Sequence, residues 1–217
     1  MDCCHAYGCD ELFDEEQARR DAEAYRADGL DELGRRIVEE VGTTRSVLEI
    51  GGGVGALQIE LLRAGAERVI SVELSPAYEA VAHALLAEAG VRDRVDRRLG
   101  DFVRDPGLAA DADAVVLHRV VCCYPDADAL VRAAGAKARR VLVLTYPHEG
   151  WRMRLEIGVE NLSHRLRRRT FRAYVHERAR LERAARAAGL VPEREDGDAR
   201  WRIGTFVRPA SPVASVS

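Results

Sequence analysis

One short segment, VLEIGGGVG at residues 47–55, most constrains what this chain can fold into. Apolar residues run directly into glycines at positions 51, 52, 53 and 55, and a helical pattern follows them. Glycine lets the backbone turn sharply and approach a ligand closely, where a Cβ atom would collide. The first turn of the helix then offers free N–H groups to a carboxylate or a phosphate. The segment therefore predicts a buried strand, a ligand-binding loop and a helix.

Short apolar strands and helical patterns alternate along most of the chain. The predicted strands are residues 46–50, 68–73, 94–99, 113–118, 140–146, 191–195 and 200–207. The predicted helices are residues 11–28, 30–41, 54–64, 76–90, 126–138, 151–168 and 177–188. Such alternation favours parallel strands covered by helices. We therefore predict an α/β fold with a Rossmann-like, mostly parallel seven-stranded sheet and helices on both faces.

Two helical segments depart from this alternation. Residues 1–42 are predicted to form an N-terminal helical extension, and residues 43–208 the sheet domain. Within that domain, residues 149–170 are expected to form a helical lid inserted after the fifth strand, and residues 209–217 a disordered tail. The insert has an apolar face and a basic end, and a charge run of this kind more often indicates a solvated face than a contact with an anionic substrate. Its apolar positions are Trp151, Leu155, Val159, Leu162 and Leu166, and its basic ones are Arg165, Arg167, Arg168 and Arg169.

Length and charge restrict the class of protein. A chain of 217 residues fits one domain. Its net charge of -3 gives no electrostatic case for a nucleic-acid or membrane partner. No stretch approaches the roughly 18 apolar residues of a membrane span, and the polar, acidic N-terminus does not look like a secretory signal. We therefore expect a cytoplasmic protein without membrane or nucleic-acid partners.

Two acidic residues, one before and one after the glycine loop, are candidate ligand-binding residues because of their spacing from it. Gly51, Gly53 and Ala56 also satisfy the dinucleotide pattern G-x-G-x-x-A, and Glu73 lies 22 residues beyond Gly51. A carboxylate at that place can accept hydrogen bonds from ribose hydroxyls in either kind of nucleotide site. Glu49 lies within the first strand, where it suits an ammonium group and would repel a pyrophosphate.

Two further observations separate the candidate ligands. Asp101 and Phe102 follow the third strand, where an acid beside an aromatic ring can hold an adenine amino group and ring. The commonest chemistry of one-domain dehydrogenases uses a Tyr-x-x-x-Lys pair, but the one lysine of this chain, Lys137, is preceded at that distance by Ala133. Both observations disfavour a nicotinamide enzyme.

With these residues in place, the chain resembles the class I S-adenosylmethionine (SAM)-dependent methyltransferases, in their small-molecule branch. The resemblance extends over roughly Leu33 to Val207 in the order of elements. It implies that the glycine loop and Glu49 hold the methionine part of SAM, Glu73 the ribose, and Asp101 with Phe102 the adenine. The N-terminal helix, with Phe13 and Tyr25, is expected to close over SAM. The predicted SAM-binding residues are Glu49, Gly51, Gly53, Gly55, Glu73, Leu74, Asp101, Phe102, His118 and Tyr25.

The acceptor is expected beside the fourth and fifth strands. His118 directly follows the fourth strand, and imidazole titrates near neutral pH, so it is a candidate base. A purely structural role for His118 is an equal alternative. Tyr124 and Tyr146 are secondary catalytic candidates, for which a role in lining the site is favoured over catalysis. The loop after the fourth strand lacks the N-P-P-Y type of sequence found in DNA and protein amino-methyltransferases. We predict methyl transfer to the O, N, C or S atom of a small molecule, natural products of secondary metabolism included.

Three alternatives stay open at this point. One is a nucleotide-dependent oxidoreductase, and another is a non-catalytic protein with a SAM-binding fold. A third is soft-metal or arsenical chemistry at Cys3, Cys4, Cys9, Cys122 and Cys123. Their spacing is not that of a structural zinc site, and an odd count in a cytoplasmic setting indicates free thiols, so no metal is expected. The oligomeric state is also open, with a homodimer as one alternative.

Overall fold

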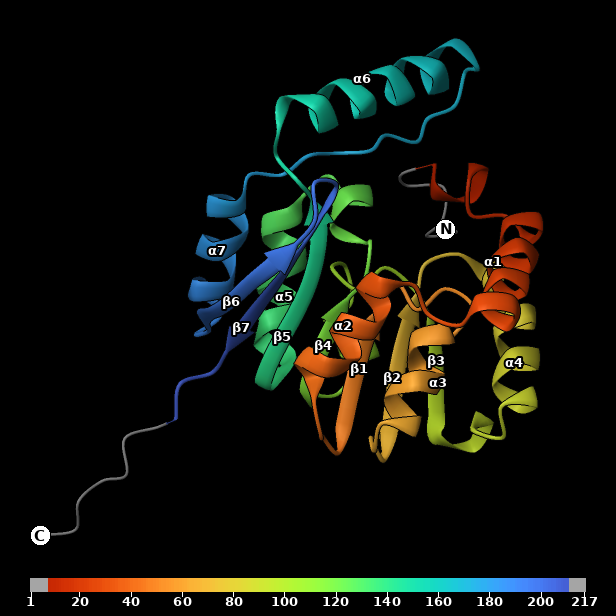
Figure 1. The fold of residues 1–217 in the computed structure, drawn as a ribbon, viewed down its shortest axis with the longest axis vertical. Coiled ribbons are helices and arrows are strands. Elements are labelled where there is room, and N and C mark those ends of the chain that lie inside the picture. The colour runs from red at the N-terminus through yellow and green to blue at the C-terminus, as the bar shows by residue number, and fades with distance from the viewer. Residues whose placement is uncertain (1–7, 211–217) are drawn as a thin grey trace, which may run out of the picture.

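A computed structural model describes residues 8–210 of the chain (Figure 1). Its centre is a seven-stranded sheet in the order β3-β2-β1-β4-β5-β7-β6. The strands are β1 (Ser46–Ile50), β2 (Arg68–Glu73), β3 (Val95–Leu99), β4 (Ala112–Leu117), β5 (Ala138–Pro147), β6 (Val191–Gly197) and β7 (Trp201–Val207). The first five are parallel, and β7 pairs antiparallel with both β5 and β6. The predicted mostly parallel seven-stranded sheet is confirmed.

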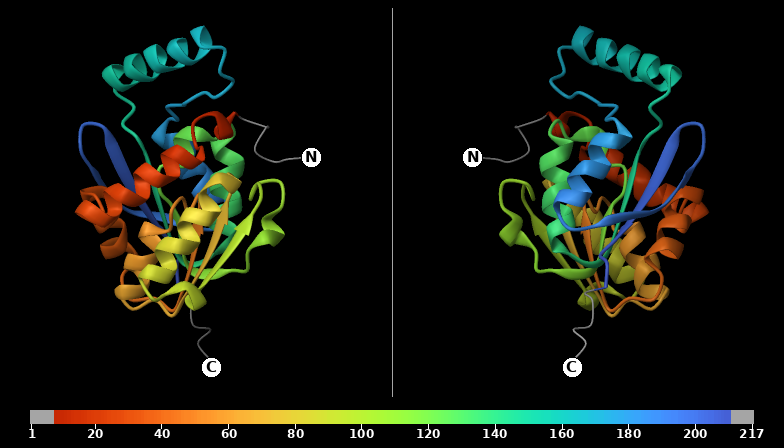
Figure 2. Two further views of the ribbon diagram at one scale, coloured as in Figure 1. Left: turned by 90° about the vertical axis from the view of Figure 1, so that its right-hand side faces the viewer. Right: turned by 90° about the vertical axis from the view of Figure 1, so that its left-hand side faces the viewer.

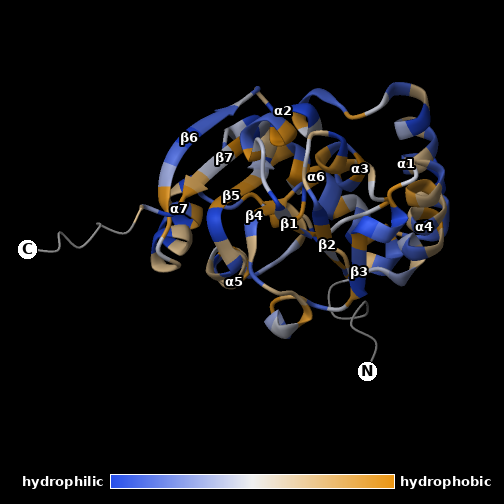
Figure 3. Cartoon of the chain, turned by 90° about the horizontal axis from the view of Figure 1, so that it is seen from below, coloured by the Kyte–Doolittle hydropathy of each residue, from blue (hydrophilic) through white to orange (hydrophobic). Residues whose placement is uncertain are grey.

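Helices cover both faces of the sheet (Figure 2). They are α1 (Glu15–Asp28), α2 (Glu32–Val41), α3 (Ala56–Arg63), α4 (Glu79–Glu88), α5 (Ala127–Lys137), α6 (Trp151–Leu166) and α7 (Arg178–Ala187). Helices α1 to α4 bury apolar side chains against one face, and α5 and α7 against the other. Hydrophobic residues gather on the central strands between these layers (Figure 3). β1 and β4 are buried on both faces along most of their length and are therefore largely apolar, with Glu49 as a buried carboxyl group within β1.

The order of the strands determines where a ligand can bind. The chain proceeds outward from β1 to β2 and β3, then returns to place β4 on the other side of β1. Ligands of open α/β sheets bind outside the carboxyl ends of the strands at such a reversal. The loops after β1, β2 and β4 therefore define the expected site.

Predicted helix ends differ from the observed ones where capping residues decide them. Helix α1 begins at residue 15 because the side chain of Asp14 accepts a hydrogen bond from the Gln17 N–H. Helix α3 begins at residue 56 because Gly55, with a φ of +86°, forms its N-cap. The predicted tail lies outside the described residues from 211 onward.

Helix α6 stands apart from the layered body, above the carboxyl ends of the strands (Figure 1). An irregular segment, residues 167–177, returns from it to α7. The predicted helix after the fifth strand is thus present. No helix within residues 8–210 is long and apolar enough to cross a membrane.

Candidate active site

The glycine loop, residues 51–55, connects β1 to α3 in a backbone conformation that other residues rarely adopt. Gly51, Gly53 and Gly55 have φ values of +76°, +48° and +86°. A Cβ atom added to Gly51 would lie 2.3 Å from a Cγ atom of Val120, in the loop after β4. The loops after β1 and β4 therefore touch here only because position 51 carries no side chain.

Glu73, at the end of β2, holds this loop through its carboxylate. Its Oε2 atom accepts the N–H of Gly53 at 2.8 Å. Its Oε1 atom accepts the N–H groups of Leu74 at 2.8 Å and Ser75 at 2.9 Å. Glu73 as a whole residue is only 8% exposed. Three of the predicted SAM-binding residues are thus brought together, and their contact with a cofactor stays a prediction.

Glu49 lies beneath the glycine loop, on the side of β1 that faces α3. It is 2% exposed, and its Oε2 atom accepts a hydrogen bond of 2.8 Å from the side-chain amide of Gln58. Burial raises the pKa of Glu49 to about 8, against the smaller lowering effects of Gln58 and Arg97. The acid is therefore largely protonated at neutral pH, and a nearby cation would favour its ionised form.

Arg97, on β3, is a site residue that the sequence analysis missed. Its side chain is fully buried and donates from Nη2 to the carbonyl oxygen of Gly53 at 2.9 Å. The same guanidinium pairs with Glu79 at 2.7 Å and donates to Gln58 Oε1 at 3.3 Å. The position of Arg97 could have indicated that it points inward, because residues two apart on a strand share a face and Val95 is buried. An arginine at such an inward position requires buried partners.

Asp101 and Tyr124 contact each other across the loops after β3 and β4. The hydroxyl of Tyr124 donates to the carboxylate of Asp101, at 3.2 Å from Oδ1 and 3.4 Å from Oδ2. Asp101 also accepts the N–H of Val103 at 3.0 Å. The ring of Phe102 is 3% exposed and packs in the apolar layer under α5. Asp101 thus borders the loops, whereas Phe102 lies in the core.

His118 follows β4 at a strained turn. The next residue, Arg119, has a φ of +58°, and its N–H donates to Thr145 Oγ1 at 2.7 Å. The Nδ1 atom of His118 is buried and has no hydrogen-bond partner within residues 8–210. Burial, reinforced by the charge of Arg119, lowers the pKa of His118 to about 4. The imidazole is therefore neutral at physiological pH and has an unused ring nitrogen.

A comparison with known protein families finds a match that includes the glycine loop. Residues 47–143, from β1 into β5, match the family described as methyltransferase domain. The match covers 97 of the 217 residues, a little under half of the chain. The fold of the chain is the Rossmann-like fold that the resemblance predicted.

A curated relative matches part of this chain. The 3-hydroxy-5-methyl-1-naphthoate 3-O-methyltransferase of Streptomyces sahachiroi is 34% identical over 82 residues, which are 38% of this chain and 24% of the relative. The match thus spans about a quarter of that enzyme's length.

Solved structures share the fold of this chain at low identity. Magnesium protoporphyrin IX methyltransferase from Synechocystis PCC 6803, with bound S-adenosylhomocysteine (SAH), is 20% identical, with a TM-score of 0.63 over 90% of this chain and 83% of that one. An O-methyltransferase family protein from Burkholderia thailandensis is 18% identical, with a TM-score of 0.67 over 90% and 63%. An O-methyltransferase from neocarzinostatin biosynthesis, with SAH and 1,4-dihydroxy-2-naphthoic acid, is 22% identical, with a TM-score of 0.62 over 80% and 52%.

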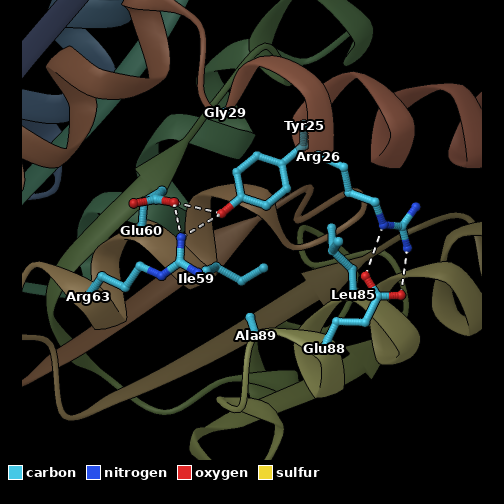
Figure 4. A pocket seen from close by; sticks show the side chains of 9 residues that line it. All are labelled: Tyr25, Arg26, Gly29, Ile59, Glu60, Arg63, Leu85, Glu88 and Ala89. Atoms are coloured by element: carbon cyan, nitrogen blue, oxygen red, sulfur yellow. Dashed lines mark hydrogen bonds and ion pairs between the residues drawn. The ribbon is translucent and has the colours of Figure 1, made fainter.

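Two tyrosines from the set of predicted site residues donate their hydroxyls to carboxylates on other elements. The hydroxyl of Tyr25 donates to Glu60 of α3 at 2.6 Å, in a cleft between α1, α3 and α4 (Figure 4). The hydroxyl of Tyr146 donates to Glu195 of β6 at 3.1 Å. Buried hydroxyls need acceptors, and each of these has one within the protein. Their predicted roles, Tyr25 in binding SAM and Tyr146 in catalysis, stay predictions.

The N-terminal extension contacts the loop after β2 and the segment after α6 through Phe13. The carbonyl oxygen of Phe13 accepts the hydroxyl of Ser75 at 2.7 Å, next to Glu73. Its ring lies 6.4 Å from that of Tyr78 and 5.9 Å, edge-on, from that of Phe171. Phe13 thus joins the end of β2 to the segment that follows α6.

The cysteines between residues 8 and 210 form no evident metal site. The Sγ atoms of Cys122 and Cys123 lie 3.5 Å apart, and Cys9 is buried. Within the described residues, no three His, Cys, Asp or Glu side chains are arranged to hold a metal ion. Cys3 and Cys4 lie outside that range.

Proposed function

We propose that this chain is a SAM-dependent methyltransferase that methylates a small molecule, and that the acceptor atom is an aromatic hydroxyl oxygen. The match of residues 47–143 to the methyltransferase-domain family supports the reaction class. The naphthoate 3-O-methyltransferase relative supports oxygen over the N, C or S atoms that the sequence left open. A cytoplasmic location, a place in secondary metabolism and a homodimeric state stay predictions.

The residues around the glycine loop fit SAM. The glycines let the loop pass closely under Val120, which fills the place of a Cβ atom at Gly51, and turn the chain into the first turn of α3. Glu49 is a buried carboxyl group whose ionised form an ammonium group would stabilise. Glu73 stands at the β2 end, where ribose hydroxyls are bound in this fold. These three positions would hold the methionine and ribose parts of SAM.

His118 is the proposed catalytic base. SAM, when bound, supplies an activated methyl group on its sulfonium. The protein's task is then to hold the acceptor oxygen close and in line, and to remove its proton. Because the pKa of His118 is about 4, its imidazole is neutral and can accept that proton at a ring nitrogen. The single observation that supports this proposal is that Glu73 holds the glycine loop and Glu49 lies beneath it, while the loop that follows His118 touches Gly51 through Val120.

Calorimetric titration with SAM, SAH and NAD(H) tests the cofactor. We expect SAM and SAH to bind, NAD(H) not to bind, and Glu73→Gln to weaken SAM binding. Glutamine is preferable to alanine here, because it keeps one oxygen for the N–H groups that Glu73 accepts. Thermal unfolding of the variant controls for folding. Binding of NAD(H) alone would instead assign an oxidoreductase.

Turnover separates an enzyme from a non-catalytic SAM-binding protein. We expect SAH to form when the protein is given SAM and a panel of aromatic hydroxyl compounds. SAM binding without turnover on phenolic, amine or thiol acceptors would favour the non-catalytic alternative. Turnover on amines or thiols only would overturn the assignment of oxygen.

A further inference from the structure

Helix α6 exposes an unusually apolar surface, which we call the outer stripe. Its members lie at spacings of four, four, three and four residues, so they share one face of the helix. They are Trp151 (70% exposed), Leu155 (59%), Val159 (60%), Leu162 (55%) and Leu166 (76%). Five large apolar side chains more than half exposed on one helix indicate a contact surface.

The outer stripe points away from the rest of the protein. The buried residues of α6 are Met153 and His164, each two positions after a stripe residue. Successive helical residues rotate by about 100°, so two positions place a side chain on nearly the opposite face. The inner face is also fixed by Asn161, which exchanges two hydrogen bonds of 2.9 Å with Ala173. A lid contacting the acceptor through its apolar face would turn the stripe inward, and this one faces outward.

Positive charge surrounds the stripe. Residues 151–172 contain seven arginines and two glutamates, a local surplus of five positive charges in a chain whose net charge is -3. The ion pairs found within residues 8–210 include none of these arginines, although Arg169 lies near enough to Glu11 for their charges to interact. One of the two glutamates, Glu156, is paired with Arg200 at 2.9 Å. The overall net charge thus hides an unneutralised basic segment beside an apolar face.

We propose that α6 docks this chain on the surface of an anionic lipid bilayer. A helix of 16 residues is about 24 Å long, and an apolar face flanked by arginines lies in the membrane interface without crossing it. The stripe enters the acyl boundary, and the arginines contact anionic headgroups. This inference does not depend on the proposed function.

Charge and geometry favour a bilayer over other occupants. A second copy docking through the same helix would bring together two segments that each carry a surplus of five positive charges. A helix-binding groove on another protein would enclose several faces of α6, but Met153 and His164 already attach its inner face to this chain. A lipid surface needs one face only.

Vesicle flotation tests the proposal with the full chain. We expect binding to vesicles of phosphatidylcholine with phosphatidylglycerol, little binding to pure phosphatidylcholine, and loss of binding at high salt. Leu155→Ser with Leu162→Ser should weaken binding at least about tenfold, because two apolar side chains that enter the bilayer are lost. The matched control is Leu99→Ser with Val191→Ser, which removes exposed apolar residues elsewhere and should not change binding.

A second pair of variants tests the role of charge. Replacing Arg165, Arg167 and Arg168 by Gln should weaken binding about a hundredfold, whereas the same change at Arg132, Arg139 and Arg183 should not. Circular dichroism confirms that each variant is folded. Equal binding to neutral vesicles, no binding at all, or an α6-dependent dimer in lipid-free light scattering would overturn the proposal.

Discussion

Arg97 and Gly53 are joined by a hydrogen bond of 2.9 Å, from the guanidinium to the carbonyl oxygen, although they are 44 residues apart. On the other side, the N–H of Gly53 is accepted by Glu73 at 2.8 Å. Both polar groups of this peptide position are therefore held by buried charged side chains. The glycine loop has a fixed shape before any ligand arrives, which lowers the entropic cost of binding.

Replacing Arg97 should loosen the cofactor site. We expect Arg97→Gln to weaken SAM binding about tenfold or more, and to cost about 3 kcal/mol of stability because Glu79 loses its buried partner. The charge of Arg97 also lowers the pKa of Glu49, so the variant should shift the pH midpoint of SAM binding upward. Titration calorimetry across pH measures the SAM affinity and its pH midpoint, and urea unfolding measures the stability. Arg98→Gln, which breaks an exposed pair with Asp96, is the control and should change neither.

Glu49 should make the protein less stable as pH rises. Its folded pKa of about 8 lies above its ordinary value of 4.5, so between these pH values the folded chain holds a proton that the unfolded chain has released. The free energy of unfolding should therefore fall by up to about 1.4 kcal/mol per pH unit across that window. Urea unfolding of the wild type and Glu49→Gln measures the difference. An equal pH dependence in both, with the exposed Glu193→Gln as reference, would refute the assignment.

Local sequence patterns predicted the sheet because each strand's signal lies within the strand. β1 and β2 were predicted with their observed bounds, since apolar runs end there at glycines or at a carboxylate. The glycine loop was predicted because backbone conformations with positive φ demand glycine. These features depend on neighbouring residues alone.

The buried network around the loop depends on residues that are distant in sequence. Gln58, Ser71 and Arg97 come from three different elements, and only the strand order brings them under Gly53. The hydrogen-bond partners of Tyr25 and Tyr146 could not be predicted for the same reason. A pattern shows that a tyrosine is near a strand end or helix, but not which distant carboxylate will accept its hydroxyl.

Removing the hydroxyl of Tyr25 should leave cofactor binding unchanged. The hydroxyl serves Glu60 on α3, so Tyr25→Phe should cost about 1 kcal/mol of stability at most. SAM affinity should stay within about twofold, measured by calorimetry. A large loss of affinity without loss of stability would restore Tyr25 to the cofactor site.

Replacing His118 should remove the chemical step while leaving cofactor binding intact. If His118 is the base, His118→Asn should lower kcat on a hydroxyl acceptor about a hundredfold or more, with SAM affinity nearly unchanged. Because the pKa of His118 is about 4, the wild-type rate should fall only as pH drops toward that value, when the imidazole becomes protonated. Tyr146→Phe is the matched control, since its hydroxyl serves Glu195, and it should keep kcat within about twofold. Stopped assays of SAH formation across pH measure both variants. A Tyr146→Phe enzyme as impaired as His118→Asn would show that the two side chains act together in a form of the site that this structure does not contain.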